Sequence, residues 1–215
     1  MTTNVWTNMS VKVQSALAAA LTVTAITKAS PGVATYTGSP DLVNGDWVLL
    51  TVAGMYQLNE KLVRVANVEI VGNTFELEGV DTTLYDTFSS GTVQTVTFGT
   101  TLSIIRGLQG SGGDFAEIDD TTIHDTVRVV IPGVANPISY NLECRYDPSD
   151  AGLVALVAAS TAKAKRAVRF KFPGGAYFGF YGYVGATGLP VGNAQDIAVT
   201  PVEIKGGAKA TFYAS

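Results

Sequence analysis

Short runs of alternating apolar and polar residues, separated by Gly, Pro and Asn, make up much of the chain. Between residues 22 and 98 these runs include DWVLLTV, KLVRVANVEIV and TVQTVTF. Asn44-Gly45 and Gly72-Asn73 interrupt them, and both dipeptides suit turns because Gly and Asn adopt positive φ at the smallest steric cost. The spacing predicts five or six short strands in a meander that could close into a small barrel.

A helical pattern replaces this alternation at residues 148–165. Leu153 and Leu156 share an apolar stripe at helical spacing. The remaining faces carry mostly alanine, whose small side chain would let the helix lie close against a sheet. Asp147 is placed to cap the first turn, ahead of a proline that suits the first helical position. The last turn is expected to hold the basic residues Lys163, Lys165 and Arg166, which suit the negative end of the helix dipole.

The period then changes to two, which predicts a β-hairpin. Val168, Phe170 and Phe172 point to one side, and Arg169 and Lys171 point to the other. A Pro-Gly-Gly turn follows. The second strand alternates phenylalanine and valine with the tyrosines Tyr177, Tyr181 and Tyr183.

The remaining segments divide the chain into three parts. Residues 1–21 fit a helix or a strand equally well and are expected to join the C-terminal core. Residues 22–98 form the small β module, which is inserted or appended. Residues 99–215 form the core, in which the Gly-rich stretch RGLQGSGGD at 106–114 is expected to be a long loop or a flexible arm. The predicted fold class is mainly β with one flanking helix.

The composition agrees with this fold class and argues against some classes of function. Of the 215 residues, 47% are hydrophobic, only 15% are charged, and 23 are glycine. So few charged residues suggest that part of the protein surface is covered by other subunits. The net charge of −4 argues against tight nucleic-acid binding, which normally requires a basic stripe.

No constellation for catalysis or metal binding emerges from the sequence. His124 is the only histidine, and Cys144, the only cysteine, is expected to be a small buried side chain in a strand. The carboxylates near His124 lack the spacing of a Ca²⁺ loop. The apolar run ALAAALTVTAI lacks the positively charged start of a secretory signal, and no run is long enough to span a bilayer. We therefore expect no enzyme, no cofactor and no membrane segment.

Two oppositely charged groups suggest contacts between copies of the chain. We define the acidic rim as Asp114, Glu117, Asp119, Asp120 and Asp125, and the basic set as Lys163, Lys165, Arg166, Arg169 and Lys171. Opposite charges on two distinct patches favour a head-to-tail contact, which closes into a ring when the rotation per subunit divides the circle. Tyr177, Tyr181 and Tyr183 would add contact area. The alternatives are a nucleic-acid patch and an ordinary amphipathic sheet face.

Several stretches, in order, resemble the tail tube proteins of long-tailed bacteriophages. They are GGDFAEIDDTTIHD, IPGVANPISYNLECRYDPSDAGLVAL, FPGGAYFGFYGYVG and PVGNAQDIAVTPVEI, and the resemblance covers most of residues 98–213. Residues 22–98 resemble a small all-β module that recurs in phage structural proteins.

The resemblance implies a tail-tube-type β-sandwich or barrel flanked by one helix. Six subunits would join into rings through a continuous inner sheet, and the rings would stack into the hollow tube of the virion tail, assembled in the host cytoplasm. Implied partners are copies of the chain itself, a tape measure protein, a tail terminator, and genomic DNA that passes without specific binding. The alternatives are a tail terminator or baseplate ring, and a β-sandwich carbohydrate-binding module.

Overall fold

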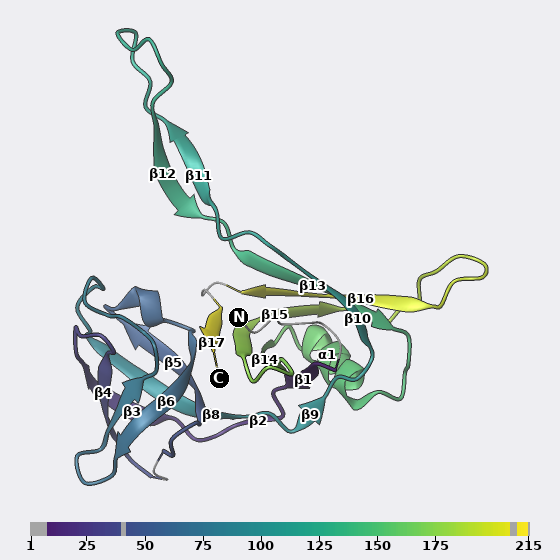
Figure 1. Ribbon diagram of the computed structural model, residues 1–215, viewed down its shortest axis with the longest axis horizontal. Coiled ribbons are helices and arrows are strands. Elements are labelled where there is room, and N and C mark those ends of the chain that lie inside the picture. Colours follow the sequence, from purple (N-terminus) through teal and green to yellow (C-terminus); the bar gives the residue numbers. More distant parts are fainter. Residues whose placement is uncertain (1–7, 40–41, 207–209, 215) are drawn as a thin grey trace.

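The computed structural model describes residues 8–39, 42–206 and 210–214. It confirms a mainly β fold with a helix beside the sheets, and it groups the described strands into a barrel, a larger sheet and a separate hairpin (Figure 1). All pairings between strands in these groups are antiparallel.

Six strands close into the barrel by pairing in the order β8-β3-β4-β7-β6-β5 and back to β8. They are β3 (Leu21–Ile26), β4 (Val33–Thr37), β5 (Trp47–Ala53), β6 (Leu62–Glu69), β7 (Thr74–Leu77) and β8 (Ser90–Thr97), with the 3₁₀ helix η1 (Tyr56–Leu58) after β5. β2 (Ala16–Leu17) extends β8 at one end. Closure satisfies both edges of every barrel strand, and Tyr36 and Phe75 fill the interior with ring centroids 5.8 Å apart.

The larger sheet has eight strands. Its order is β10 (Ile105–Ser111), β13 (Ile138–Arg145), β16 (Val199–Gly206), β15 (Tyr177–Ala186), β14 (Lys165–Lys171), β1 (Ser10–Val13) and β9 (Thr100–Thr101), and β17 (Thr211–Tyr213) pairs with β15. The predicted hairpin is therefore β14 and β15. The helix α1 (Ala151–Thr161) lies against one face, where Leu153 and Leu156 join a core with Phe170, Phe180 and Ile204.

The predicted helix bounds, 148–165, are wrong at both ends. Asp150, not Asp147, is the N-cap, and its Oδ1 accepts the N–H of Leu153 at 3.0 Å. The carboxylate of Asp147 instead closes a short turn by accepting the hydroxyl of Ser149 at 2.6 Å. Lys163 has a positive φ of 50° just after the helix, so the expected basic last turn does not form.

Two further segments differ from expectation. The Gly-rich stretch at 106–114 is mostly strand β10, because pairing with β13 satisfies its backbone where side chains supply little. The segment that does extend is residues 112–137, hereafter the arm. It contains β11 (Phe115–Asp119) and β12 (Val130–Ala135), and Figure 1 shows it projecting from the rest of the molecule. β1 settles the ambiguous N-terminal stretch as strand where it is described.

An apolar junction joins the barrel to the larger sheet. Trp47 lies edge-on to Tyr213 with ring centroids 5.2 Å apart, and Leu62 and Ala167 are buried in the same cluster. The hydroxyl of Tyr213 accepts the backbone N–H of Arg64 at 2.7 Å. A Cβ at Gly179 would lie 2.6 Å from the Trp47 ring, so only glycine lets the two sheets approach this closely. Sequence reasoning did not foresee this packing.

Candidate subunit interface

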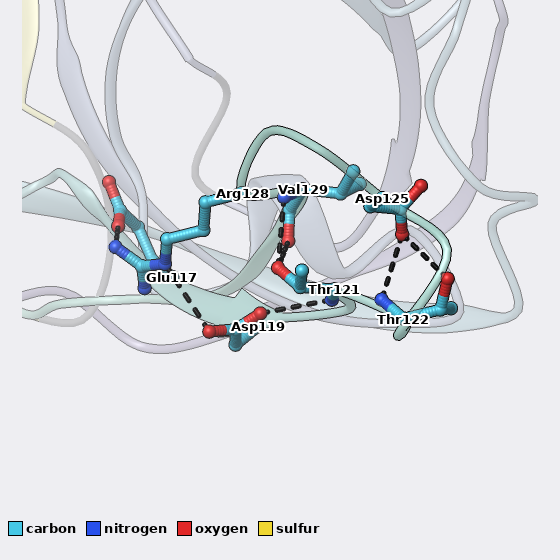
Figure 2. A network of polar contacts seen from close by, with 7 residues as sticks. All are labelled: Glu117, Asp119, Thr121, Thr122, Asp125, Arg128 and Val129. Carbon is cyan, nitrogen blue, oxygen red and sulfur yellow. Dashed lines mark hydrogen bonds and ion pairs between the residues drawn. The ribbon is translucent and has the colours of Figure 1, made fainter.

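The arm is a two-stranded hairpin that is held by polar contacts along its length. In Figure 2, the hydroxyl of Thr121 bridges the strands, since it accepts the N–H of Val129 at 3.0 Å. Near the tip, one carboxylate oxygen of Asp125 accepts both the N–H and the hydroxyl of Thr122, each at 2.8 Å. These local bonds give the hairpin its shape. They provide no hydrophobic core, because nothing in the described chain lies against either face.

Aliphatic side chains on the arm are exposed to solvent. Ile118 and Ile131 are cross-strand partners, and they remain 51% and 45% exposed. Further exposed apolar residues of the arm are Phe115, Ile123, Val127, Val129, Val130 and Val134. An isolated two-stranded hairpin is at best marginally stable in water, and a contiguous apolar patch usually marks an interaction site. The arm therefore has the physical character of a segment that is covered in an assembly.

The acidic rim lies along this arm. Arg128 bridges two of its members, Glu117 at 3.5 Å and Asp119 at 3.3 Å (Figure 2). The side-chain and backbone hydrogen bonds from Thr121 hold the pKa of Asp119 below its ordinary value, and those from Thr122 do the same for Asp125. The lowered pKa keeps these two carboxylates, Asp119 and Asp125, ionised throughout the physiological pH range.

The basic set lies on the main body and is not one patch. Lys165 forms an ion pair with Glu60 of the barrel, and the guanidinium of Arg166 donates to the carbonyl of Lys165 at 3.0 Å. Arg169 and Lys171 follow on β14, on the side of the strand that faces the barrel, while Lys163 is exposed beyond α1. The five residues are close together in sequence, but Arg166 lies on the opposite side of β14 from Lys165, Arg169 and Lys171, because side chains alternate along a strand.

The three tyrosines also separate. Tyr177 and Tyr181 pack against the junction cluster, and burial raises the pKa of Tyr181. Tyr183 is 54% exposed, and its ring lies 4.6 Å from the ammonium group of Lys165. Of the three, Tyr183 thus offers the most open surface. Whether these residues and the two charged groups contact another subunit stays a prediction.

A second candidate surface for assembly is the outer edge of the larger sheet. β10 is at one end of the strand order and pairs with β13 alone among the described strands. Its charged residue Arg106 and a register shift between Ile105 and Gly107 protect the start of this edge, whereas the remaining residues contain no charge and no proline. The backbone groups along the other side of β10 can therefore pair with a strand from another molecule.

The residues considered for chemistry are far apart. Cys144 is fully buried in β13, where desolvation raises its pKa to about 11, as expected for an unreactive structural thiol. His124 is exposed near the tip of the arm. Within the described residues, no three His, Cys, Asp or Glu side chains are grouped so that they could hold a metal ion. None of the helices in these parts of the chain has the length and apolar character needed to cross a bilayer.

An open sheet edge and an unsupported apolar arm are features typical of a structural subunit of an assembly. A family model described as phage tail tube protein, TTP, matches residues 53–215, from the last residue of β5 to the end of the chain. The chain belongs to this family. No curated protein matches it. The protein is therefore a structural component of a bacteriophage tail and self-assembles into a tube.

Proposed function

We propose that the protein polymerises as hexameric rings that stack into the tail tube, and that the bore of the tube conducts genomic DNA to the host during ejection. The family assignment over residues 53–215 carries this proposal. The open edge of β10 supports it, because a subunit with an unpaired edge can extend its sheet into the next subunit of a ring.

Passage of DNA requires that the protein does not hold phosphate. Each Lys or Arg contact to phosphate adds a salt-dependent attraction that would slow sliding. On the larger sheet, Arg106 lies 3.7 Å from Glu143 and Lys205 lies 3.2 Å from Glu203, so a carboxylate of the same chain partly neutralises each cation. Together with the net charge of −4, this pairing supports a conduit that leaves DNA free to move.

The barrel is a separate module of the proposed tube subunit. Residues 22–98 form a module inserted in or appended to a tube core made of residues 1–21 and 99–215. The buried junction at Trp47 supports a module that moves with the core rather than on a flexible tether. The remaining partners of the proposal are a tape measure protein inside the growing tube and a tail terminator at its end, with assembly in the host cytoplasm.

The test is to image the purified chain by cryo-electron microscopy over a range of concentrations. The proposal predicts hollow rods whose cross-section averages with six-fold symmetry and whose length increases with concentration. Rods with a different symmetry would contradict the hexamer. Isolated rings that never stack would indicate a terminator or baseplate ring instead, and a protein that stays monomeric at every concentration would contradict assembly altogether.

A further inference from the structure

We propose that the arm of one copy docks on a basic stripe of a neighbouring copy, formed by Lys12, Arg169 and Lys171. The inference rests on the proposed function in one respect, namely that the partner is a second copy of this chain. It adds the partner surface of the arm and a residue, Lys12, that the sequence did not point to.

The first observation is the distribution of charge. The arm contains the five carboxylates of the acidic rim and a single cation, Arg128, so its net charge is −4. The whole chain also has a net charge of −4, with 14 Lys and Arg against 18 Asp and Glu. All of the excess negative charge therefore lies on the arm, and the remaining chain is neutral.

The second observation is a group of cations without counter-ions. Lys12 of β1 is directly opposite Arg169 of β14 in the sheet, and Lys171 is two residues further along the same side of β14. Like charges at directly opposed positions destabilise a pair of strands. None of the three forms an ion pair with a carboxylate in the described residues, unlike the neighbouring Lys165, which is bound to Glu60. The chain thus tolerates an unfavourable juxtaposition that an anionic partner would relieve.

The third observation is that Arg169 is partly removed from water. Its guanidinium lies 4.8 Å from the centre of the Phe98 ring and 5.7 Å from that of Tyr177. Desolvation lowers its pKa, which means that the surroundings disfavour its charged form. A carboxylate from a partner would compensate this desolvation. The same rings offer an apolar surface to the exposed aliphatic residues of the arm.

The contact must form between molecules rather than within one. The arm extends away from β1 and β14 of its own chain (Figure 1). Its only ion pairs in the described structure are those of Arg128 with Glu117 and Asp119, so no cation of the body reaches the acidic rim. Charge complementarity between an acidic arm and a basic stripe on one chain gives a head-to-tail contact, which propagates through an assembly.

A charge-swap experiment tests the proposal by measuring the critical concentration for assembly with sedimentation and electron microscopy. One variant reverses the arm (Asp119→Lys with Asp120→Lys), a second reverses the stripe (Lys12→Glu with Lys171→Glu), and a third combines both. We expect each reversal alone to raise the critical concentration about tenfold or more, because like charges then face each other. The combined variant should recover assembly to within about threefold of the original protein, since the attraction is restored with opposite sign.

The matched control reverses two exposed cations elsewhere, Lys28→Glu with Arg145→Glu, and should leave the critical concentration unchanged. Circular dichroism and thermal unfolding of each variant at low concentration verify that the monomer is folded. The inference is overturned if the original protein assembles and the reversals assemble equally well, if the control blocks assembly as strongly as the stripe reversal, or if the combined variant does not recover. Failure of the original protein to assemble would instead contradict the proposed function.

Discussion

The barrel and the arm are both built from antiparallel strands, and they treat their apolar residues in opposite ways. The barrel closes its sheet and buries Tyr36, Leu50 and Phe75 completely. The arm leaves Ile118 and Ile131 half-exposed on a hairpin with no second layer. A strand pair therefore indicates little about stability until the surface that covers it is known, and within the described chain no second layer covers the arm.

The contrast between the barrel and the arm also means that substitutions in the two regions should affect different properties, folding of the monomer and assembly. A substitution in the barrel should act on the free energy of unfolding of the monomer, since its contacts are complete within one chain. A substitution on the exposed side of the arm should act on association, since the monomer does not use those side chains. The largest expected change in monomer stability therefore comes from the barrel, and the largest expected changes in association come from the arm.

Phe75→Ala in the barrel should destabilise the monomer by about 3–5 kcal/mol, because it removes a fully buried ring and leaves a cavity beside Tyr36. Urea unfolding followed by circular dichroism measures the change. A loss below about 1 kcal/mol would mean that the barrel interior collapses around the gap, and it would weaken the contrast with the arm.

Thr82→Val should lower the free energy of unfolding by about 1–3 kcal/mol, because the Thr82 hydroxyl forms hydrogen bonds between two loops at one end of the barrel. Its buried hydroxyl lies 2.7 Å from the carbonyl oxygen of Thr27 and accepts the N–H of Ala29 at 3.1 Å. Thr82→Ser keeps the hydroxyl and should retain most of the stability in the same unfolding assay. Equal losses for the two variants would assign the effect to packing rather than to hydrogen bonding.

Ile118→Ala in the arm should change the free energy of unfolding of the monomer by less than about 0.5 kcal/mol, because the side chain is already exposed. The same variant should raise the critical concentration for assembly. Unfolding measured below that concentration, together with sedimentation above it, separates the two effects. A large loss of monomer stability would show that the arm folds back on its own body in solution.

The smallest expected effect concerns the charge of the acidic rim at low pH. Hydrogen bonds hold the folded-state pKa of Asp119 and Asp125 below the ordinary value of 3.8, so their contribution to the hairpin is fully present above about pH 3.8. The contribution is lost as the pH falls through the lowered pKa. NMR titration of the carboxyl carbons checks this, and Thr121→Ala should return the pKa of Asp119 towards 3.8. An unchanged pKa in that variant would contradict the assigned cause.

Local sequence patterns predicted the elements that are formed by interactions between residues close together in sequence. The turn dipeptides indicated where strands of the barrel end, and the change to a period of two predicted β14 and β15. The start of α1 was misplaced because Asp147 and Asp150 are both suitable caps. The choice between them involves a long-range contact, since Asp150 Oδ2 also accepts the hydroxyl of Ser103 at 2.7 Å. No pattern near residue 150 contains that information.

The candidate interface was predictable only in part, for the same reason. The residues of the acidic rim are close together in sequence, so the sequence alone predicted the group. The basic stripe depends on the pairing of Lys12 with Arg169, which are distant in sequence. The junction likewise depends on Trp47 and Tyr213 meeting across two sheets. The sequence predicted a long loop or a flexible arm at 106–114, because glycines there give no strand pattern, and β10 forms only through its pairing with β13.

The most direct test of the arm as the assembly element is its removal. In the arm-deleted variant, residues 114–136 are replaced by an Asn-Gly turn, and sedimentation velocity and cryo-electron microscopy are run beside the full chain. The account predicts a folded monomer, with unfolding of the barrel and larger sheet unchanged, that forms no rods at concentrations where the full chain assembles. Rods of normal width at the same concentration would contradict it.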